Sequence, residues 1–158
     1  MTTSPRLSAP MPIEPQWLDY NGHLNMAYYN VLFDRGVDQV FETLGFGPAY
    51  RERTGNTTFS AEFHLCYIRE LHLGDEVTAS FQLLDHDAKS FHFYQELRHT
   101  DGWLSATGEG MGLHIDQSGP RVAPMPEDIL ARLDALAREH SALPQPERVG
   151  RQIGIRRK

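Results

Sequence analysis

Residues 26 to 44 carry the pattern that most constrains the fold, because large apolar side chains recur there at steps of three and four, the repeat of one helix face. These positions are Met26, Tyr29, Phe33, Val37, Val40, Phe41 and Leu44. Asn25 precedes them as a residue type that caps helices, and Gly45 ends the pattern. Gly36 inside the pattern costs helix stability, and we interpret it as a point of close packing against a flat partner.

The second half of the chain alternates apolar and polar residues in four runs, which is the period of β-strands. The runs are Thr57–Ile68, Val77–Leu84, Lys89–Arg98 and Trp103–Asp116. Their short connections favour an antiparallel meander. The Pro-rich segment from Ala9 to Gln16 is expected to add a short edge strand, and the segment from Pro48 to Asn56 is interpreted as a loop.

Three glycines fall on one face of the last run, where they remove packing side chains. They are Gly108, Gly110 and Gly112. We expect the long helix to approach the sheet over them, with Gly36 as the matching notch. Because one helix cannot cover both faces of a sheet, the apolar pattern from Pro126 to His140 is interpreted as a second, shorter helix.

The length of 158 residues and the 40% hydrophobic content are those of one globular domain. We assign residues 1–143 to this domain and residues 144–158 to a basic tail, since five Arg and Lys residues and no acid follow residue 147. The formal net charge is −6, so the body of the chain is acidic and nucleic-acid binding is not expected. No apolar run is long enough for a membrane span and no signal pattern is present, which favours the cytoplasm.

Metal and redox chemistry find little support in the sequence. Cys66 is the only cysteine, so it forms no internal disulfide and no multi-cysteine zinc cluster. The eight histidines lack a compact ligand spacing, and no metal is expected.

The turn before the long helix carries the chemistry. Asp19, Gly22, His23, Asn25 and Tyr29 stand in an order and spacing that resembles the signature of hotdog-fold acyl-CoA thioesterases of the 4-hydroxybenzoyl-CoA thioesterase and YbgC type. The resemblance implies an α+β fold: a single hotdog domain in which a curved antiparallel sheet wraps around a long central helix. It also implies a homodimer or homotetramer, with the acyl-CoA bound at the subunit interface.

The same resemblance implies roles for individual residues. Asp19 would be the catalytic carboxylate, as nucleophile or general base, and the backbone N–H of Met26 would bind the thioester oxygen. His23 and Asn25 would support them. No cofactor is expected, because coenzyme A enters as part of the substrate. Tyr28 stands where the 4-hydroxybenzoyl-CoA enzymes commonly carry Asn, which leaves the acyl group open.

A wider set of side chains is expected to bind substrate. The candidates are Trp17, Tyr20, Gly22, Tyr28, Tyr29, Glu62, His64, Lys89 and Ser90. The aromatic members favour a compact acyl group that is short, aromatic or cationic. Each also has a structural reading, since Asp19 can form an Asx turn and the helical aromatic residues can pack in the core.

Two other functions remain open at this stage. Hotdog hydratases of the enoyl-CoA type place a histidine five residues after the aspartate, whereas His23 follows Asp19 by four with no preceding proline. A non-catalytic acyl-CoA binding protein would keep the fold without turnover. Thioester hydrolysis is the function that the turn favours.

Overall fold

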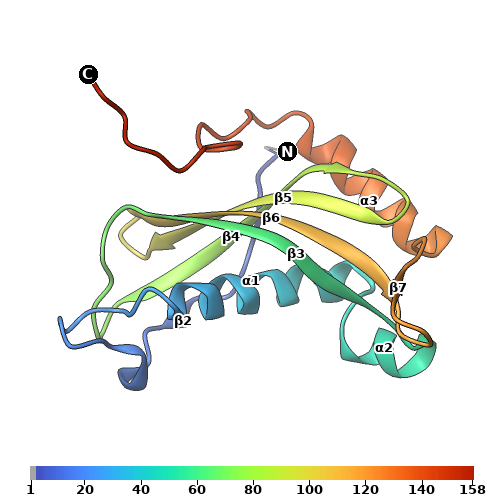
Figure 1. Ribbon diagram of the computed structural model, residues 1–158, viewed down its shortest axis with the longest axis horizontal. Coiled ribbons are helices and arrows are strands. Elements are labelled where there is room, and N and C mark those ends of the chain that lie inside the picture. Colours follow the sequence, from blue (N-terminus) through green and yellow to red (C-terminus); the bar gives the residue numbers. More distant parts are fainter. Residues whose placement is uncertain (1–2) are drawn as a thin grey trace.

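Residues 3–158, the part of the chain that the computed structural model describes, form one antiparallel sheet with three α-helices (Figure 1). The elements are β1 (Arg6–Leu7), β2 (Met11–Pro12), a 3₁₀ helix (Pro15–Trp17), α1 (Tyr28–Leu44), α2 (Pro48–Thr54), β3 (Asn56–Tyr67), β4 (Glu76–His86), β5 (Ser90–His99), β6 (Leu104–Asp116), β7 (Arg121–Val122) and α3 (Glu127–His140). The strand order is β1-β4-β5-β6-β3, with β2 also paired to β4 and β7 to β6.

The four long strands lie within two residues of the predicted bounds, and the Pro-rich lead-in pairs with the edge of β4 as expected, although only Met11–Pro12 is a strand. The connection from Pro48 to Thr54 was wrongly predicted as a loop and is the helix α2. Pro48 suits its first turn, and Gly55 ends it in the left-handed conformation at φ 72°. Its polar sequence carries no apolar stripe by which it could have been recognised.

Helix α1 runs along one face of the sheet, and the strands arch over it (Figure 1). Its predicted core positions Tyr29, Phe33, Val37, Val40 and Leu44 are buried. Gly45 ends the helix at φ 96°, a conformation that only glycine adopts without strain. The helix begins at Tyr28, two residues later than the pattern predicted, so Met26 lies outside it and is 65% exposed.

The predicted contact between α1 and the glycines of β6 is wrong. A Cβ at Gly108, Gly110 or Gly112 would meet the rings of Phe63, Phe93 or Phe91, which reach across from β3 and β5. A layer of phenylalanine rings therefore separates β6 from the helix. Gly36 makes its close approach on β4 instead, where an added Cβ would lie 2.5 Å from the Cβ of Ala79.

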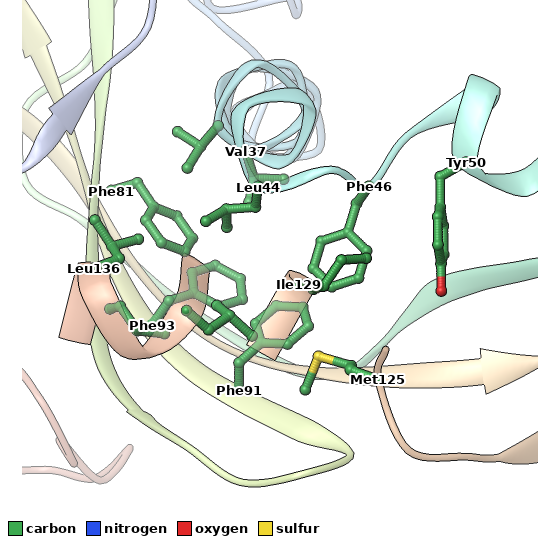
Figure 2. Close-up of a cluster of buried hydrophobic side chains, with 13 residues drawn as sticks. Val37, Leu44, Phe46, Tyr50, Phe81, Phe91, Phe93, Met125, Ile129 and Leu136 are labelled. Atoms are coloured by element: carbon green, nitrogen blue, oxygen red, sulfur yellow. The ribbon is translucent and has the colours of Figure 1, made fainter. Parts of the chain in front are cut away.

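The second helix does not cover the other face of the sheet. Ile129, Leu133 and Leu136 of α3 join the same apolar cluster as Val37 and Phe81, as Figure 2 shows. The ring of His140 lies at the end of α3, and its Nδ1 accepts a 2.9 Å hydrogen bond from the backbone N–H of Leu83. Helix α3 thus covers the edge of β4 next to the part of that edge that pairs with β1.

The outer face of the sheet is crossed by part of the C-terminal segment. The side chain of Gln82 donates a hydrogen bond to the carbonyl of Pro144, and the N–H of Gly150 donates to the carboxylate of Glu109 at 2.8 and 3.0 Å. Residues 144–150 therefore contact the sheet at these points, whereas Ile153 and Ile155 are 90% and 85% exposed. The division of the chain at residue 143 stays a prediction.

Strand β3 is the long open edge of the sheet, since no strand pairs with its outer side within residues 3–158. Its central residues, including Phe59, Ala61 and Glu62, are exposed. An unpaired edge of this length is a ready template for another strand. No helix among the described residues is long and apolar enough to span a membrane.

Candidate active site

The turn that carries Asp19 is held by its own backbone. The N–H of Asp19 donates to the carbonyl of His23, and the N–H of Gly22 donates to the carbonyl of Asp19, both at 3.0 Å. Gly22 takes a φ of 79°, which is why a glycine stands there. One carboxylate oxygen of Asp19 accepts a 2.8 Å hydrogen bond from the N–H of Asn21, as an Asx turn requires. Its other oxygen has no hydrogen-bond partner among residues 3–158 and remains available to a substrate.

The start of α1 places the backbone N–H of Met26 beside this turn. Asn25 was predicted to be the N-cap residue of α1. The N-cap residue is Ala27, and Asn25 lies two residues before it. Its side-chain oxygen accepts from the N–H of Ala27 at 3.0 Å, and its carbonyl accepts from the N–H of Tyr28 at 3.0 Å. No described residue accepts a hydrogen bond from the N–H of Met26. This donor stands at the positive end of the helix dipole.

The end of β3 contacts the segment that leads into α1. The hydroxyl of Tyr67 donates a 3.0 Å hydrogen bond to the carbonyl of Met26. Its ring meets that of Tyr29 edge to face, with the centroids 5.0 Å apart and the planes at 85°. Burial raises the pKa of both phenols, although the Ser105 side chain and the backbone of Leu71 lower that of Tyr29 in part. Both rings are therefore neutral at ordinary pH.

These groups share one cleft of about 310 Å³. It is lined by Asp19, His23, Leu24, Met26, Tyr29, Tyr67, Ile68, Arg69 and Glu70. The structure thus brings together the predicted Asp19, His23, Met26 and Tyr29. The sequence interpretation missed Tyr67 and Glu70 as site residues, because they lie some forty residues away and reach the cleft only through the course of β3.

His23 anchors the turn. It forms an isolated β-bridge with His72, and the two imidazole rings meet edge to face at 5.8 Å. The next residue, Leu24, donates its N–H to the carbonyl of Leu71 at 2.7 Å. The turn of Asp19 is therefore tied to the connection between β3 and β4.

Trp17 and Tyr28 pack against each other and do not line the cleft. Their rings stack at 5.8 Å, and the guanidinium of Arg35 lies 4.9 Å from the centre of the indole ring. Tyr20 is 98% exposed, and the space around Gly22 is open. The prediction that Trp17, Tyr20 and Tyr28 surround the reacting group finds no support within one chain.

Glu62 and His64 belong to a different cleft of about 800 Å³, between the edge of the sheet, its outer face and the C-terminal segment. His64 Nε2 lies 3.7 Å from the Cys66 sulfur. This cleft touches the Asp19 cleft only at Tyr67. Within residues 3–158, no three His, Cys, Asp or Glu side chains are grouped so that they could hold a metal ion.

Lys89 and Ser90 lie at the opposite end of the sheet from Asp19. Ser90 begins β5 and pairs with Leu113 near the end of β6, whereas the Asp19 cleft adjoins the end of β3 and the start of β6. Both residues donate their backbone N–H groups to the carboxylate of Asp87 at 2.7 Å. Within one chain they take no part in the cleft.

A third cavity, of about 320 Å³, lies farther along α1, between the helix and β3. It is lined by Asn30, Val31, Phe33, Asp34, Val37, Ser60, Phe63, Phe93 and Gln95. This cavity and the Asp19 cleft thus flank the open edge of the sheet. A molecule that lies along this edge would meet them in turn.

Comparisons with known proteins relate the chain to thioesterases. Residues 13–133 match the family model of the thioesterase-like superfamily. A protein of Pseudomonas aeruginosa with the name betainyl-CoA thioesterase is 41% identical over 145 residues, which are 91% of this chain and 91% of that protein. A bifunctional protein of Rhizobium meliloti, L-carnitine dehydrogenase/betainyl-CoA thioesterase, is 32% identical over 92% of this chain, which spans 29% of its length.

Solved structures agree as well. A hypothetical protein of Staphylococcus aureus in complex with CoA superposes with a TM-score of 0.91 at 28% identity, over 99% of this chain and 98% of that one. The DHNA-CoA thioesterase of the same organism superposes with a TM-score of 0.75 at 16% identity, over 84% of this chain and 94% of that one, and shares the fold. The predicted hotdog fold and the predicted thioester hydrolase class are confirmed. The chain belongs to the thioesterase-like superfamily.

Proposed function

We propose that this thioesterase hydrolyses betainyl-CoA, a CoA thioester whose small acyl group ends in a quaternary ammonium, and that Asp19 carries the reaction. The observation behind the proposal is one cleft that holds both a carboxylate oxygen of Asp19 and the N–H of Met26, neither of which has a hydrogen-bond partner among residues 3–158. Thioester hydrolysis needs this pair: a group that attacks or activates water, and a donor for the oxygen where negative charge develops.

Asp19 and the N–H of Met26 act on different atoms of the thioester carbonyl. The N–H of Met26, at the positive end of α1, donates a hydrogen bond to the carbonyl oxygen and stabilises its developing charge. Asp19 then follows one of two routes. As a nucleophile its oxygen bonds to the carbonyl carbon, the carbon–sulfur bond breaks, CoA leaves as the thiolate, and water hydrolyses the resulting anhydride. As a general base it takes a proton from water, the water oxygen bonds to the carbonyl carbon, the carbon–sulfur bond breaks, and the departing CoA thiolate takes up the proton.

Supporting residues hold the reacting groups in place. Asn25 fixes the turn of Met26 through its two hydrogen bonds, and His23 ties the Asp19 turn to His72. The chemistry needs no bound cofactor, because CoA arrives as part of the substrate. We also propose a cytoplasmic location, since CoA thioesters are intracellular metabolites.

Betainyl-CoA is the substrate named for the Pseudomonas aeruginosa relative. Support from this chain comes from the small volume of the cleft, about 310 Å³, and from its aromatic walls. Such a cleft suits a compact acyl group.

We propose further that two copies pair through β3 to form a homodimer, which two dimers can extend to a homotetramer. In a two-fold antiparallel pairing, the start of one β3 lies beside the end of the other. Helix α2, with Arg51 and Arg53 in its last turn, precedes β3 directly, so it would approach the Asp19 cleft of the second copy. Lys89 and Ser90 lie at the same end of the sheet. These groups would meet the CoA phosphates at the interface.

The experiment is a substrate panel with the purified protein. Release of free CoA thiol is measured for betainyl-, acetyl-, 4-hydroxybenzoyl- and palmitoyl-CoA, and kcat/KM is compared. We expect the highest value for betainyl-CoA and the lowest for palmitoyl-CoA. A clear preference for either the aromatic or the long-chain thioester would contradict the proposed substrate.

A further inference from the structure

We infer that Tyr29, Tyr67 and Glu70 form a subsite for the quaternary ammonium of the acyl group. The inference rests on the proposed function and names the residues that would select a cationic substrate. Each of the three lines the cleft that holds Asp19 and Met26. Tyr67 and Glu70 lie at the end of β3 and just beyond it, and Tyr29 lies in the first turn of α1.

The two tyrosine rings supply aromatic walls. They meet at 85° with their centroids 5.0 Å apart, so they form a corner and not a flat stack. Neutral aromatic faces attract a cation through their electron-rich centres, and a quaternary ammonium, which offers no hydrogen-bond donor, relies on this attraction. Tyr67 is 47% exposed and supplies the open ring, whereas Tyr29 is 4% exposed and packs edge to face against it.

Glu70 supplies the charge. Its side chain is exposed, and no Lys, Arg or His nitrogen of residues 3–158 lies within 4.0 Å of its carboxylate. Glu70 lines the same cleft as Tyr29, and its negative charge adds to the effect of burial, which raises the pKa of that phenol. Its carboxylate is therefore free to attract a cation held against the two rings.

The guanidinium of Arg69 is engaged elsewhere. Arg69 also lines the cleft, but its Cζ lies 4.0 Å from the centre of the Trp103 ring. That cation–π contact holds Arg69 on the indole. Two carboxylates, Asp19 and Glu70, thus face one arginine, and the field in the cleft favours a positive acyl group.

The distances within the substrate agree with this placement. In a betainyl group the ammonium nitrogen is two bonds from the carbonyl carbon. With the carbonyl oxygen on the N–H of Met26, the ammonium must lie beside that residue. Tyr67 touches the same residue through the 3.0 Å hydrogen bond to its carbonyl, so its ring is within reach of the ammonium.

A neutral substrate of the same shape tests the inference. In 3,3-dimethylbutanoyl-CoA a carbon replaces the ammonium nitrogen, so size is kept and charge is lost. We compare the ratio of kcat/KM for betainyl-CoA to that for 3,3-dimethylbutanoyl-CoA in the wild type, Glu70→Gln and Tyr67→Leu. Glu127→Gln, on the exposed first turn of α3, removes the same charge far from the cleft.

We expect the wild type to prefer the cationic thioester. Both cleft variants should reduce that preference, Glu70→Gln by about tenfold, which corresponds to about 1.4 kcal/mol, whereas Glu127→Gln should retain it. A Glu70→Gln enzyme that keeps the wild-type preference would overturn the subsite and leave the betainyl-CoA activity standing. A wild type that does not hydrolyse betainyl-CoA would instead overturn the proposed function and, with it, the subsite.

Discussion

The hydroxyl of Tyr67 at the end of β3 donates a 3.0 Å hydrogen bond to the carbonyl of Met26, just before α1. This contact spans forty-one residues of sequence and joins the sheet to the peptide unit that follows the proposed oxygen-binding N–H. Residue 26 itself lies outside the helix and is 65% exposed. Its orientation therefore depends on Tyr67 and Asn25, and not on helical hydrogen bonds of its own.

Removal of this hydroxyl should slow catalysis. Tyr67→Phe keeps the ring and loses one hydrogen bond, which is about 0.5–1.5 kcal/mol, so we expect kcat to fall about two- to tenfold with a smaller change in KM. Tyr94→Phe is the matched control, because Tyr94 is a buried tyrosine of β5 that does not line the Asp19 cleft. A Tyr67→Phe enzyme with an unaltered kcat and a lowered melting temperature would mean that the contact is structural only.

The open edge of β3 predicts assembly. Ala61→Lys places a charge at an exposed position in the middle of this edge, where it would oppose pairing with a second copy. We expect the wild type to be at least a dimer by light scattering at micromolar concentration. The variant should shift toward monomer and lose most of its activity. Ala135→Lys, on the exposed side of α3, should do neither. A fully active wild-type monomer would contradict the interface.

The glycines of β6 predict a stability effect. Gly110→Ala would push its Cβ against the buried ring of Phe93, and such overpacking costs about 1–3 kcal/mol of unfolding free energy. Gly119→Ala is the control, since nothing lies within 4 Å of its Cβ position. Urea unfolding measures both. Equal stability of the two variants would show that the ring can move aside without cost.

The glycines of β6 also show a feature of the packing that could not be predicted from the sequence. The pattern revealed that β6 lacks side chains on one face, but the space could be filled by a helix or by rings from neighbouring strands. The choice depends on register, because β3 and β5 place Phe63 and Phe93 opposite Gly110. The register follows from packing of the whole sheet, which no single strand encodes.

The candidate site also contains residues that the sequence alone could predict and residues that only the fold brings together. Asp19, His23, Asn25 and Met26 lie within eight residues, so a local signature was enough to relate them. Tyr67 and Glu70 reach the cleft through the tertiary course of β3 and carry no local signature. Glu62 and His64 were predicted from a shared strand face, and Lys89 and Ser90 from their place at the start of a strand. Within one chain all four lie outside the Asp19 cleft.

The buried His140 predicts a pH dependence of stability. Burial lowers its pKa, with a further lowering by Arg6 and an opposing effect of Glu139, and its neutral Nδ1 accepts from the N–H of Leu83. In the unfolded chain His140 takes up a proton below about pH 6.5, whereas the folded protein resists this uptake. The unfolding free energy should therefore fall as the pH falls below that value, by at most about 1.4 kcal/mol per pH unit from this residue.

His140→Gln isolates the contribution, because glutamine can accept a hydrogen bond without titrating. Urea unfolding of both proteins across this pH range gives the difference in slope. The wild type should lose more stability than the variant toward acid, until its own folded His140 protonates. Parallel curves would mean that folding leaves the pKa of His140 at its ordinary value.

The most direct test of the account is the turnover number of Asp19→Asn with the thioester that the wild type hydrolyses best. Asparagine keeps an oxygen to accept the hydrogen bond from Asn21, so the turn is retained while the carboxylate is lost. Asp128→Asn, an exposed residue in the first turn of α3, controls for the change in net charge. We predict that kcat of Asp19→Asn falls by about 10²–10⁴-fold, with CoA binding kept and Asp128→Asn fully active. A folded Asp19→Asn enzyme that releases CoA at the wild-type rate would contradict the central role of Asp19.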